Sequence, residues 1–329
     1  MPDDLKERNL WTVSNATYCP ENLKLRLDLL TNFFSHLIFI VMLALLFKAW
    51  PLAAQDRFFD SNGVQIRYID QGSGEPVVLI HGLLGNIEWG WGDRGDIGII
   101  ANLSKDHRVI AFDVRGHGKS GKPYDADAYG QQMCLDVLRL LDHLKIQRAH
   151  IVGYSNGGRI VAKLLTTNPE RFLTATMGGS SGTRTWGPAE EKRAQDQIDA
   201  FTKGIPFQAV ILAGWPADQP PPTEDVIRAR SQEIVARGND PLALAALART
   251  GRALLVTNDE LAAVKVPTLA IVGSADRMVN GVREIQRVMK GLNVVVIEGA
   301  GHENASRRPE FVNALREFIA AHRQTSSSR

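Results

Sequence analysis

The feature that most constrains the fold is an alternation, from Arg57 onward, between short apolar runs rich in β-branched residues and amphipathic helical patterns. This alternation is typical of a mostly parallel sheet with helices on its faces, an α/β fold. Several runs are apolar throughout, as strands buried on both faces should be. The predicted strands are 64–69, 76–80, 108–112, 149–154, 173–177, 268–272 and 293–297.

Helical patterns lie between these runs. In 128–144, apolar side chains recur at spacings of three and four residues, which predicts a helix with one apolar stripe. Segments 156–165 and 309–321 follow the same pattern. From about 180 to 264 the rhythm breaks: this stretch is rich in Ala, Glu, Gln and Arg, has three consecutive prolines at 220–222, and contains no convincing strand. We interpret it as a helical insertion packed over one end of the sheet.

These patterns divide the chain into parts. At 329 residues, it has room for one α/β domain of roughly 250 residues with an insertion. We expect an N-terminal segment (1–55) outside the fold, a core formed by 56–180 and 265–322, a helical cap (181–264) and a disordered tail (323–329).

The N-terminal segment contains a nearly continuous apolar run, FFSHLIFIVMLALLF at 33–47. These 15 residues are fewer than the roughly 20 needed to span a bilayer, but they match the apolar core of a signal peptide followed by small residues at Ala53 and Ala54. If flanking residues are counted and Lys48 snorkels, residues 29–54 could instead remain as a membrane anchor. We expect either export, to the periplasm or beyond, or anchoring in the membrane.

Composition excludes several classes of protein and partner. The chain is 44% apolar and 22% charged, as in folded globular proteins. A net charge of +2 without a long basic run argues against nucleic-acid binding. The only cysteines, Cys19 and Cys134, suggest neither a disulfide framework nor a cysteine metal site, and Cys134 fits a buried packing residue. With no phosphate loop and no cluster spaced like metal ligands, we expect no metal, nucleotide or flavin.

A serine stands between two glycines in VGYSNGG, residues 152–158. Ser155 follows the predicted strand 149–154 and precedes a helical pattern, the context in which Gly-x-Ser-x-Gly presents a nucleophile. A sharp turn would lift its hydroxyl clear of the sheet, and the helix N-terminus would favour developing negative charge. An ordinary glycine-rich turn produces the same string, so the motif alone leaves both interpretations open.

A second motif, HGLLG at 81–85, directly follows the predicted strand 76–80. The backbone N–H groups of Leu83 and Asn156 could together form an oxyanion hole for a tetrahedral intermediate. We interpret His81 as a residue that shapes this loop rather than as a catalytic base.

Two further motifs follow strands near the C-terminus. His302 in GAGHENA has the residue type and loop position of a base for the serine, although a lone loop histidine is usually only solvated. Asp276 in IVGSADRMV could orient that imidazole, cap the next helix, or pair with Arg277. The chain order serine, acid, histidine is the one expected when each follows successive strands of a parallel sheet.

Five motifs stand in one order: VVLIHG (77–82), FDVRGHGKS (112–120), GYSNGG (153–158), GSADRMV (273–279) and GHENA (301–305). In them the chain resembles the α/β-hydrolase fold family, and within it the lid-bearing esterase, lactonase and carbon–carbon hydrolase branch. The resemblance covers roughly residues 57–322. It implies a mostly parallel eight-stranded sheet flanked by helices, with a helical cap inserted after strand six.

The resemblance also implies residue roles. Ser155 would be the nucleophile, Asp276 the acid and His302 the base, with Leu83 and Asn156 as oxyanion donors. Haloalkane dehalogenases and epoxide hydrolases of this fold use aspartate where Ser155 stands, so those reactions are disfavoured.

Other positions are assigned to structure or to the pocket. The resemblance places Asp113 and Arg115 in a structural turn beside the active-site loops. Four tryptophans are candidates for an apolar pocket wall, with plain packing as the alternative for each: Trp89, Trp91, Trp186 and Trp215.

We therefore expect a serine hydrolase that cleaves a small or medium, largely apolar carboxylic ester or lactone through an acyl-enzyme. Two alternatives stay open. One is carbon–carbon bond hydrolysis or perhydrolysis by the same fold. The other is a ligand-binding protein that retains the fold with little turnover.

Overall fold

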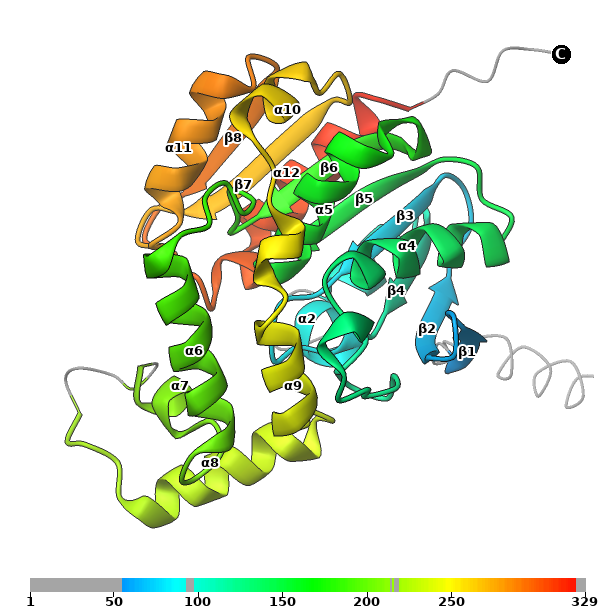
Figure 1. Cartoon of the computed structure of the whole chain (residues 1–329). Coiled ribbons are helices and arrows are strands. Elements are labelled where there is room, and N and C mark those ends of the chain that lie inside the picture. The colour runs from blue at the N-terminus through cyan, green and yellow to red at the C-terminus, as the bar shows by residue number, and fades with distance from the viewer. Residues whose placement is uncertain (1–54, 93–97, 214, 216–218, 324–329) are drawn as a thin grey trace, which may run out of the picture. The chain divides into compact units, whose positions relative to one another are not determined.

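The computed structural model describes residues 55–92, 98–213, 215 and 219–323. In this part of the chain one eight-stranded sheet has the order β1-β2-β4-β3-β5-β6-β7-β8 (Figure 1). Strand β2 is antiparallel to β1 and β4, and all other neighbours are parallel. The predicted mostly parallel, eight-stranded sheet is confirmed. The strands are β1 Arg57–Asp60, β2 Gln65–Gln71, β3 Pro76–Ile80, β4 Arg108–Phe112, β5 Ala149–Tyr154, β6 Phe172–Gly178, β7 Thr268–Gly273 and β8 Leu292–Ile297.

The strand pattern missed one element, the edge strand β1. Only Phe59 of its four residues is buried, so the segment carries no apolar run that would distinguish it from a loop. Its pairing with β2 comes from tertiary context, which routinely overrides local pattern in short edge strands.

Each face of the sheet packs against its own set of helices because successive side chains of a strand point to opposite faces. In β3, Val78 and Ile80 belong to an apolar cluster with α4 (Gln131–His143), α5 (Asn156–Thr167) and α11 (Val279–Val288). Val77 and Leu79 belong to a second cluster with α2 (Ile87–Trp91), α3 (Ile99–Leu103) and α12 (Pro309–Ala320). Cys134 is buried in the first cluster, where burial raises the pKa of its thiol to about 12.

In the described part of the segment between β6 and β7 there are five α-helices. Figure 1 shows α6 to α9 standing to one side of the sheet, whereas α10 lies beside α11. Helix α6 packs against α9 and α7 against α8, and α10 contacts α5 and α11 of the core. The helices set apart from the sheet therefore end at α9. Their bounds are α6 Pro188–Thr202, α7 Gln208–Ala213, α8 Glu224–Ala236, α9 Pro241–Ala248 and α10 Asn258–Ala263.

The predictions for the two termini lie largely outside the described residues. The signal peptide or anchor expected within 29–54 falls there entirely, as does all but the first residue of the tail expected at 323–329, so both stay predictions. Among the described residues, no helix combines the length and hydropathy needed to cross a membrane.

Candidate active site

Ser155 stands at the turn between β5 and α5 in a backbone conformation that side chains rarely adopt. Its φ is +53° and its ψ −111°, and it is the N-cap residue of α5. Its N–H donates a hydrogen bond of 2.8 Å to the carbonyl of Gly178 on the neighbouring strand β6. Strain of this kind persists only where the surroundings hold it, and it clusters at functional sites.

The two glycines of the motif are required by close backbone contacts. A Cβ on Gly153 would lie 2.2 Å from the carbonyl oxygen of Gly157, and a Cβ on Gly157 would lie 2.1 Å from that of Ile80. No side chain fits at either distance. The start of α5 is thereby pressed against the ends of β5 and β3, which brings Ser155 to the HGLLG loop.

A series of two hydrogen bonds links Ser155 to the predicted base and acid. Ser155 Oγ lies 2.9 Å from Nε2 of His302, and Nδ1 of His302 lies 2.8 Å from Oδ2 of Asp276. The Asp276 side chain is fully buried, whereas that of His302 is 19% exposed. The structure thus brings together three side chains that lie 121 and 26 residues apart in sequence.

Asp276 also accepts a hydrogen bond from the backbone. Its second oxygen, Oδ1, accepts a 2.9 Å hydrogen bond from the N–H of Met278, just before α11. The orienting interpretation holds, whereas the interpretation of Asp276 as helix N-cap is wrong: the N-cap residue of α11 is Met278, and Asp276 bonds only to the N–H of that residue.

Two residues that support His302 were not identified from the sequence. Tyr154 Oη donates a 2.5 Å hydrogen bond to the carbonyl of His302, and the two rings lie 5.6 Å apart. A Cβ on Gly179 would lie 3.2 Å from Cε1 of His302 and 3.3 Å from Oδ2 of Asp276. Tyr154 stands inside the serine motif, but only the folded chain reveals its contact with a loop 148 residues away.

The HGLLG loop lies directly beside the serine. A Cβ on Gly82 would lie 3.1 Å from that of Ser155. His81 is buried, its Nδ1 lies 2.7 Å from the Gly82 carbonyl, and its Nε2 accepts a 3.0 Å bond from the N–H of Val114. Burial lowers the pKa of His81 to about 4, so its imidazole is neutral and holds the loop. Leu83 and Asn156 both line the cavity at Ser155, while their role as oxyanion donors stays a prediction.

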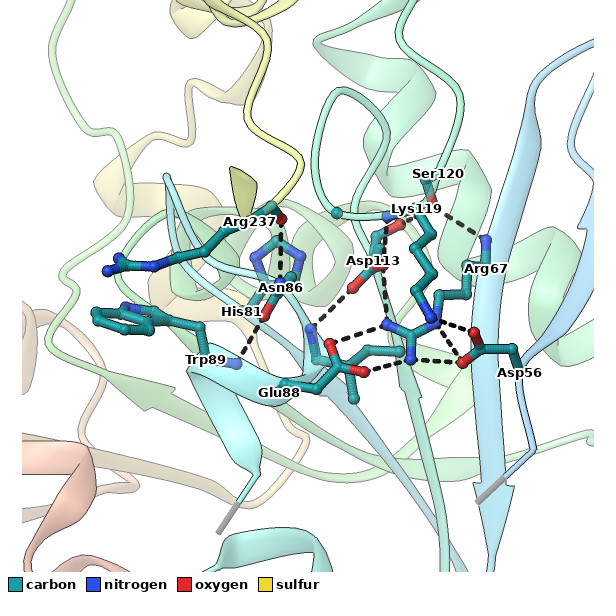
Figure 2. A network of polar contacts seen from close by, with 12 residues as sticks. Asp56, Arg67, His81, Asn86, Glu88, Trp89, Asp113, Lys119, Ser120 and Arg237 are labelled. Atoms are coloured by element: carbon teal, nitrogen blue, oxygen red, sulfur yellow. Dashed lines mark hydrogen bonds and ion pairs between the residues drawn. The ribbon is translucent and has the colours of Figure 1, made fainter. Parts of the chain in front are cut away.

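A polar network fixes the helix that follows this loop (Figure 2). Asp113 Oδ1 accepts a 2.8 Å bond from the N–H of Ile87 in α2, and Asp113 Oδ2 lies 3.1 Å from Nη1 of Arg67. Arg67 also pairs with Glu88 and Asp56. Burial alone would lower the pKa of Arg67, but the hydrogen bond with Glu88 and the charge of Asp113 raise it above its usual value. Asp113 therefore positions backbone, as the resemblance implied.

The connection between α8 and α9 contacts the same loop and helix. Asn239 Nδ2 donates to the carbonyl of Leu84 at 3.2 Å, and Asn86 Nδ2 donates to that of Arg237 at 3.1 Å. The Arg237 guanidinium lies 3.4 Å from the ring centroid of Trp89 (Figure 2). The helices after β6 are thus joined to the segment that carries the predicted oxyanion donor.

A cavity of about 1000 Å³ opens over Ser155. Of the four candidate wall tryptophans, Trp89 and Trp186 line it. The interpretation is wrong for Trp91, which is 1% exposed and packs in the core, because its side chain leaves α2 on the face opposite to Trp89. Trp215 is not among the residues lining this cavity. Its Nε1 bonds the Pro220 carbonyl at 2.9 Å.

Among the described residues, no group of three or more His, Cys, Asp or Glu side chains could hold a metal ion. A serine hydroxyl within hydrogen-bond reach of an imidazole, itself oriented by a buried carboxylate, can act as a nucleophile toward a carbonyl carbon.

Two curated proteins illustrate what the chain is similar to. It is 36% identical over 126 residues to the dihydrolipoyllysine-residue acetyltransferase component of the acetoin cleaving system of Cupriavidus necator, a match covering 38% of this chain and 32% of that protein. The chain thus spans about a third of the length of this relative. It is 25% identical over 247 residues to 3-oxoadipate enol-lactonase 1 of Acinetobacter baylyi, covering 74% of this chain and 88% of that protein.

Solved structures show the same architecture. A thermophilic esterase from Thermogutta terrifontis matches with a TM-score of 0.65 at 24% identity, over 82% of this chain and 100% of that chain. At this identity the likeness concerns the fold alone. The family model for the alpha/beta hydrolase fold matches residues 75–307, well over half of the sequence, and the chain therefore belongs to the alpha/beta hydrolase fold family.

Proposed function

We propose that this protein is a serine hydrolase that cleaves a carboxylic ester or lactone through an acyl-enzyme. Family membership supports hydrolase activity in general. The observation that carries the finer proposal is the unbroken series of hydrogen bonds from Ser155 Oγ to His302 and from His302 to Asp276. A similar protein named as an enol-lactonase is consistent with it.

In this mechanism Ser155 Oγ attacks the carbonyl carbon while His302 Nε2 takes its proton. The oxygen of the tetrahedral intermediate is stabilised by the backbone N–H groups of Leu83 and Asn156. His302 then gives the proton to the leaving oxygen, and the acyl group stays on Ser155. Water, activated by His302, releases the acid and restores the serine. Asp276 keeps Nδ1 of His302 protonated and stabilises the imidazolium.

Labelling with a fluorophosphonate probe tests the nucleophile. The purified full chain should label, and Ser155→Ala should not. Asp276→Asn should lower kcat on 4-nitrophenyl esters by about 10⁴-fold without unfolding the protein, because the imidazole is then held in the wrong tautomer. Absence of labelling in the wild type, or equal labelling of Ser155→Ala, would contradict the proposal, and near-wild-type turnover in Asp276→Asn would move the acid's role to another carboxylate.

The same assay separates the alternatives. A graded series of 4-nitrophenyl esters reports the accepted acyl length. Faster consumption of ester with hydrogen peroxide, together with peracid formation, would indicate perhydrolysis. Labelling without turnover of any ester would favour a carbon–carbon hydrolase or a ligand-binding protein.

A further inference from the structure

Several cationic side chains line the cavity at Ser155. Five arginines line it: Arg159, Arg184, Arg193, Arg277 and Arg307. Three carboxylates also line it: Glu190, Asp196 and Glu303. The sequence led us to expect a largely apolar substrate, whereas this lining carries many charged side chains.

The arginines differ in whether the protein neutralises them. Arg184 pairs with Glu284 and Arg193 pairs with Glu190, while Arg307 lies 5.3 Å from the ring centroid of Trp89. Within the part of the chain that the structure describes, neither Arg159 nor Arg277 has a carboxylate at ion-pair distance or a side-chain hydrogen bond.

These two arginines are also the ones tied to the catalytic groups. Arg159 lies one helical turn after Ser155 on α5, and its N–H donates to the Ser155 carbonyl at 3.3 Å. Arg277 directly follows Asp276, whose carboxylate holds His302. Both side chains are exposed, but toward the cavity that they line.

The surroundings of Arg159 are electrostatically unfavourable without a counterion. Partial desolvation by the cavity walls lowers the pKa of its guanidinium, and the charges of Arg277 and Arg193 lower it further. The lining carboxylates do not offset this. Glu190 is engaged by Arg193 and Asp196 by Lys192, while Glu303 forms no ion pair with Arg159 or Arg277. An anion placed between the guanidinium groups would relieve the repulsion.

We propose that the substrate carries a carboxylate besides the bond that is cleaved, and that Arg159 and Arg277 bind this group. This rests on the proposed ester or lactone hydrolysis at Ser155. The guanidinium fork matches a carboxylate bidentately, and such bonds are stronger than those between neutral groups. Anchoring the far end of an acyl or alkoxy group there would fix the scissile carbonyl over Ser155.

Two esters with the same acyl length and different charge provide the test. The full chain is assayed with mono-4-nitrophenyl adipate and with 4-nitrophenyl hexanoate. We expect the wild type to prefer the charged ester in kcat/KM. Arg159→Met should lower that preference by roughly 10- to 100-fold, mainly through KM for the charged ester, as expected for loss of a charged hydrogen bond. Added salt should reduce the wild-type preference in the same direction.

Arg184→Met is the matched control, because Arg184 lines the same cavity but is neutralised by Glu284. Its preference ratio should stay at the wild-type value. Equal rates for the two esters in the wild type, or the same ratio in Arg159→Met and wild type, would overturn the carboxylate site while leaving Ser155-dependent hydrolysis intact.

Binding to a Ser155→Ala background separates this inference from the proposed function. Titration calorimetry compares monomethyl adipate with methyl hexanoate, which is neutral. We expect the charged ester to bind more tightly and the difference to disappear in Ser155→Ala/Arg159→Met. If no probe labels Ser155, the hydrolase proposal fails, and this titration still decides the carboxylate site: no preference for monomethyl adipate would refute it.

Discussion

The sheet with its site and the helices between β6 and β7 are stabilised in different ways. In the core, Arg115 and Asp136 form an ion pair at 2.5 Å with side chains 2% and 0% exposed. On α6 and α8, by contrast, the ion pairs are exposed and join residues three or four apart on one helix. Helix α8 has two buried residues, whereas every residue of β6 is buried.

The groups around Ser155 and the side chains that line the cavity from the segment between β6 and β7 therefore lie in differently stabilised regions. The groups around Ser155 are positioned by close backbone contacts that a single methyl group would violate. The segment between β6 and β7 contributes cavity-lining side chains such as Trp186, which precedes α6, and Arg193 on α6. We expect mutations in the core to affect folding first, and mutations in α6 to α9 to affect mainly which substrate binds.

The largest expected effect is on the core ion pair. Asp136→Asn leaves the Arg115 guanidinium buried without its counterion, so it should lower the free energy of unfolding by about 3–5 kcal/mol. The matched change on α8 is Glu224→Gln, which removes an exposed partner of Arg228 and should cost less than about 0.5 kcal/mol. Urea unfolding of both variants checks this, and similar losses in the two regions would abolish the contrast.

The second expected effect is that acidic pH lowers the free energy of unfolding of the core. Burial lowers the pKa of His81 to about 4, and burial together with the charge of His81 lowers that of His117 to about 3, whereas no histidine lies between 181 and 264. At these two positions the unfolded chain takes up protons near pH 6.5 and the folded chain does not, so stability present above pH 6.5 is lost as the pH falls toward 4. We expect a loss of about 3 kcal/mol for His81 over this window.

Urea unfolding at pH 7, 6 and 5 measures this slope. His117→Gln removes one titrating group and should flatten it. A slope that is absent in the wild type, or unaltered in His117→Gln, would show that these buried imidazoles are not what acid destabilises.

The smallest effect concerns the junction between the two regions. Asn239 is 1% exposed and donates to the carbonyls of Leu84 and Ile234. Asn239→Ala should cost about 1–2 kcal/mol of stability and lower kcat on neutral esters several-fold, because the loop with the Leu83 N–H loses an anchor. Arg237→Met keeps the backbone carbonyl that Asn86 bonds. It removes the contact with Trp89 and a 3.7 Å ion pair with the exposed Glu233, so its kcat should fall less. A larger fall of kcat in Arg237→Met than in Asn239→Ala would show that the contact between Arg237 and Trp89, rather than Asn239, anchors the loop.

Most of the sheet could be predicted because strands buried on both faces must be apolar throughout. Strands β3, β4 and β5 have the predicted bounds. Strands β7 and β8 differ by one residue at one end, and β2 and β6 differ by one or two residues at both ends. The strand β1 could not be predicted, since its exposed residues carry no such signal. Trp89 and Trp91 are indistinguishable as a WGW string, yet residues two apart on a helix face different ways.

The sequence by itself determined the order of the chemical groups. A serine between obligatory glycines, a carboxylate and a histidine each follow a recognisable strand, and parallel strands place their carboxyl ends at one edge of a sheet. Only the tertiary structure decided the distances that join these groups, the contact of Tyr154 with His302, and which arginines face the cavity without a counterion. Contacts between residues far apart in sequence depend on how the elements pack in three dimensions, so the local sequence pattern does not predict them.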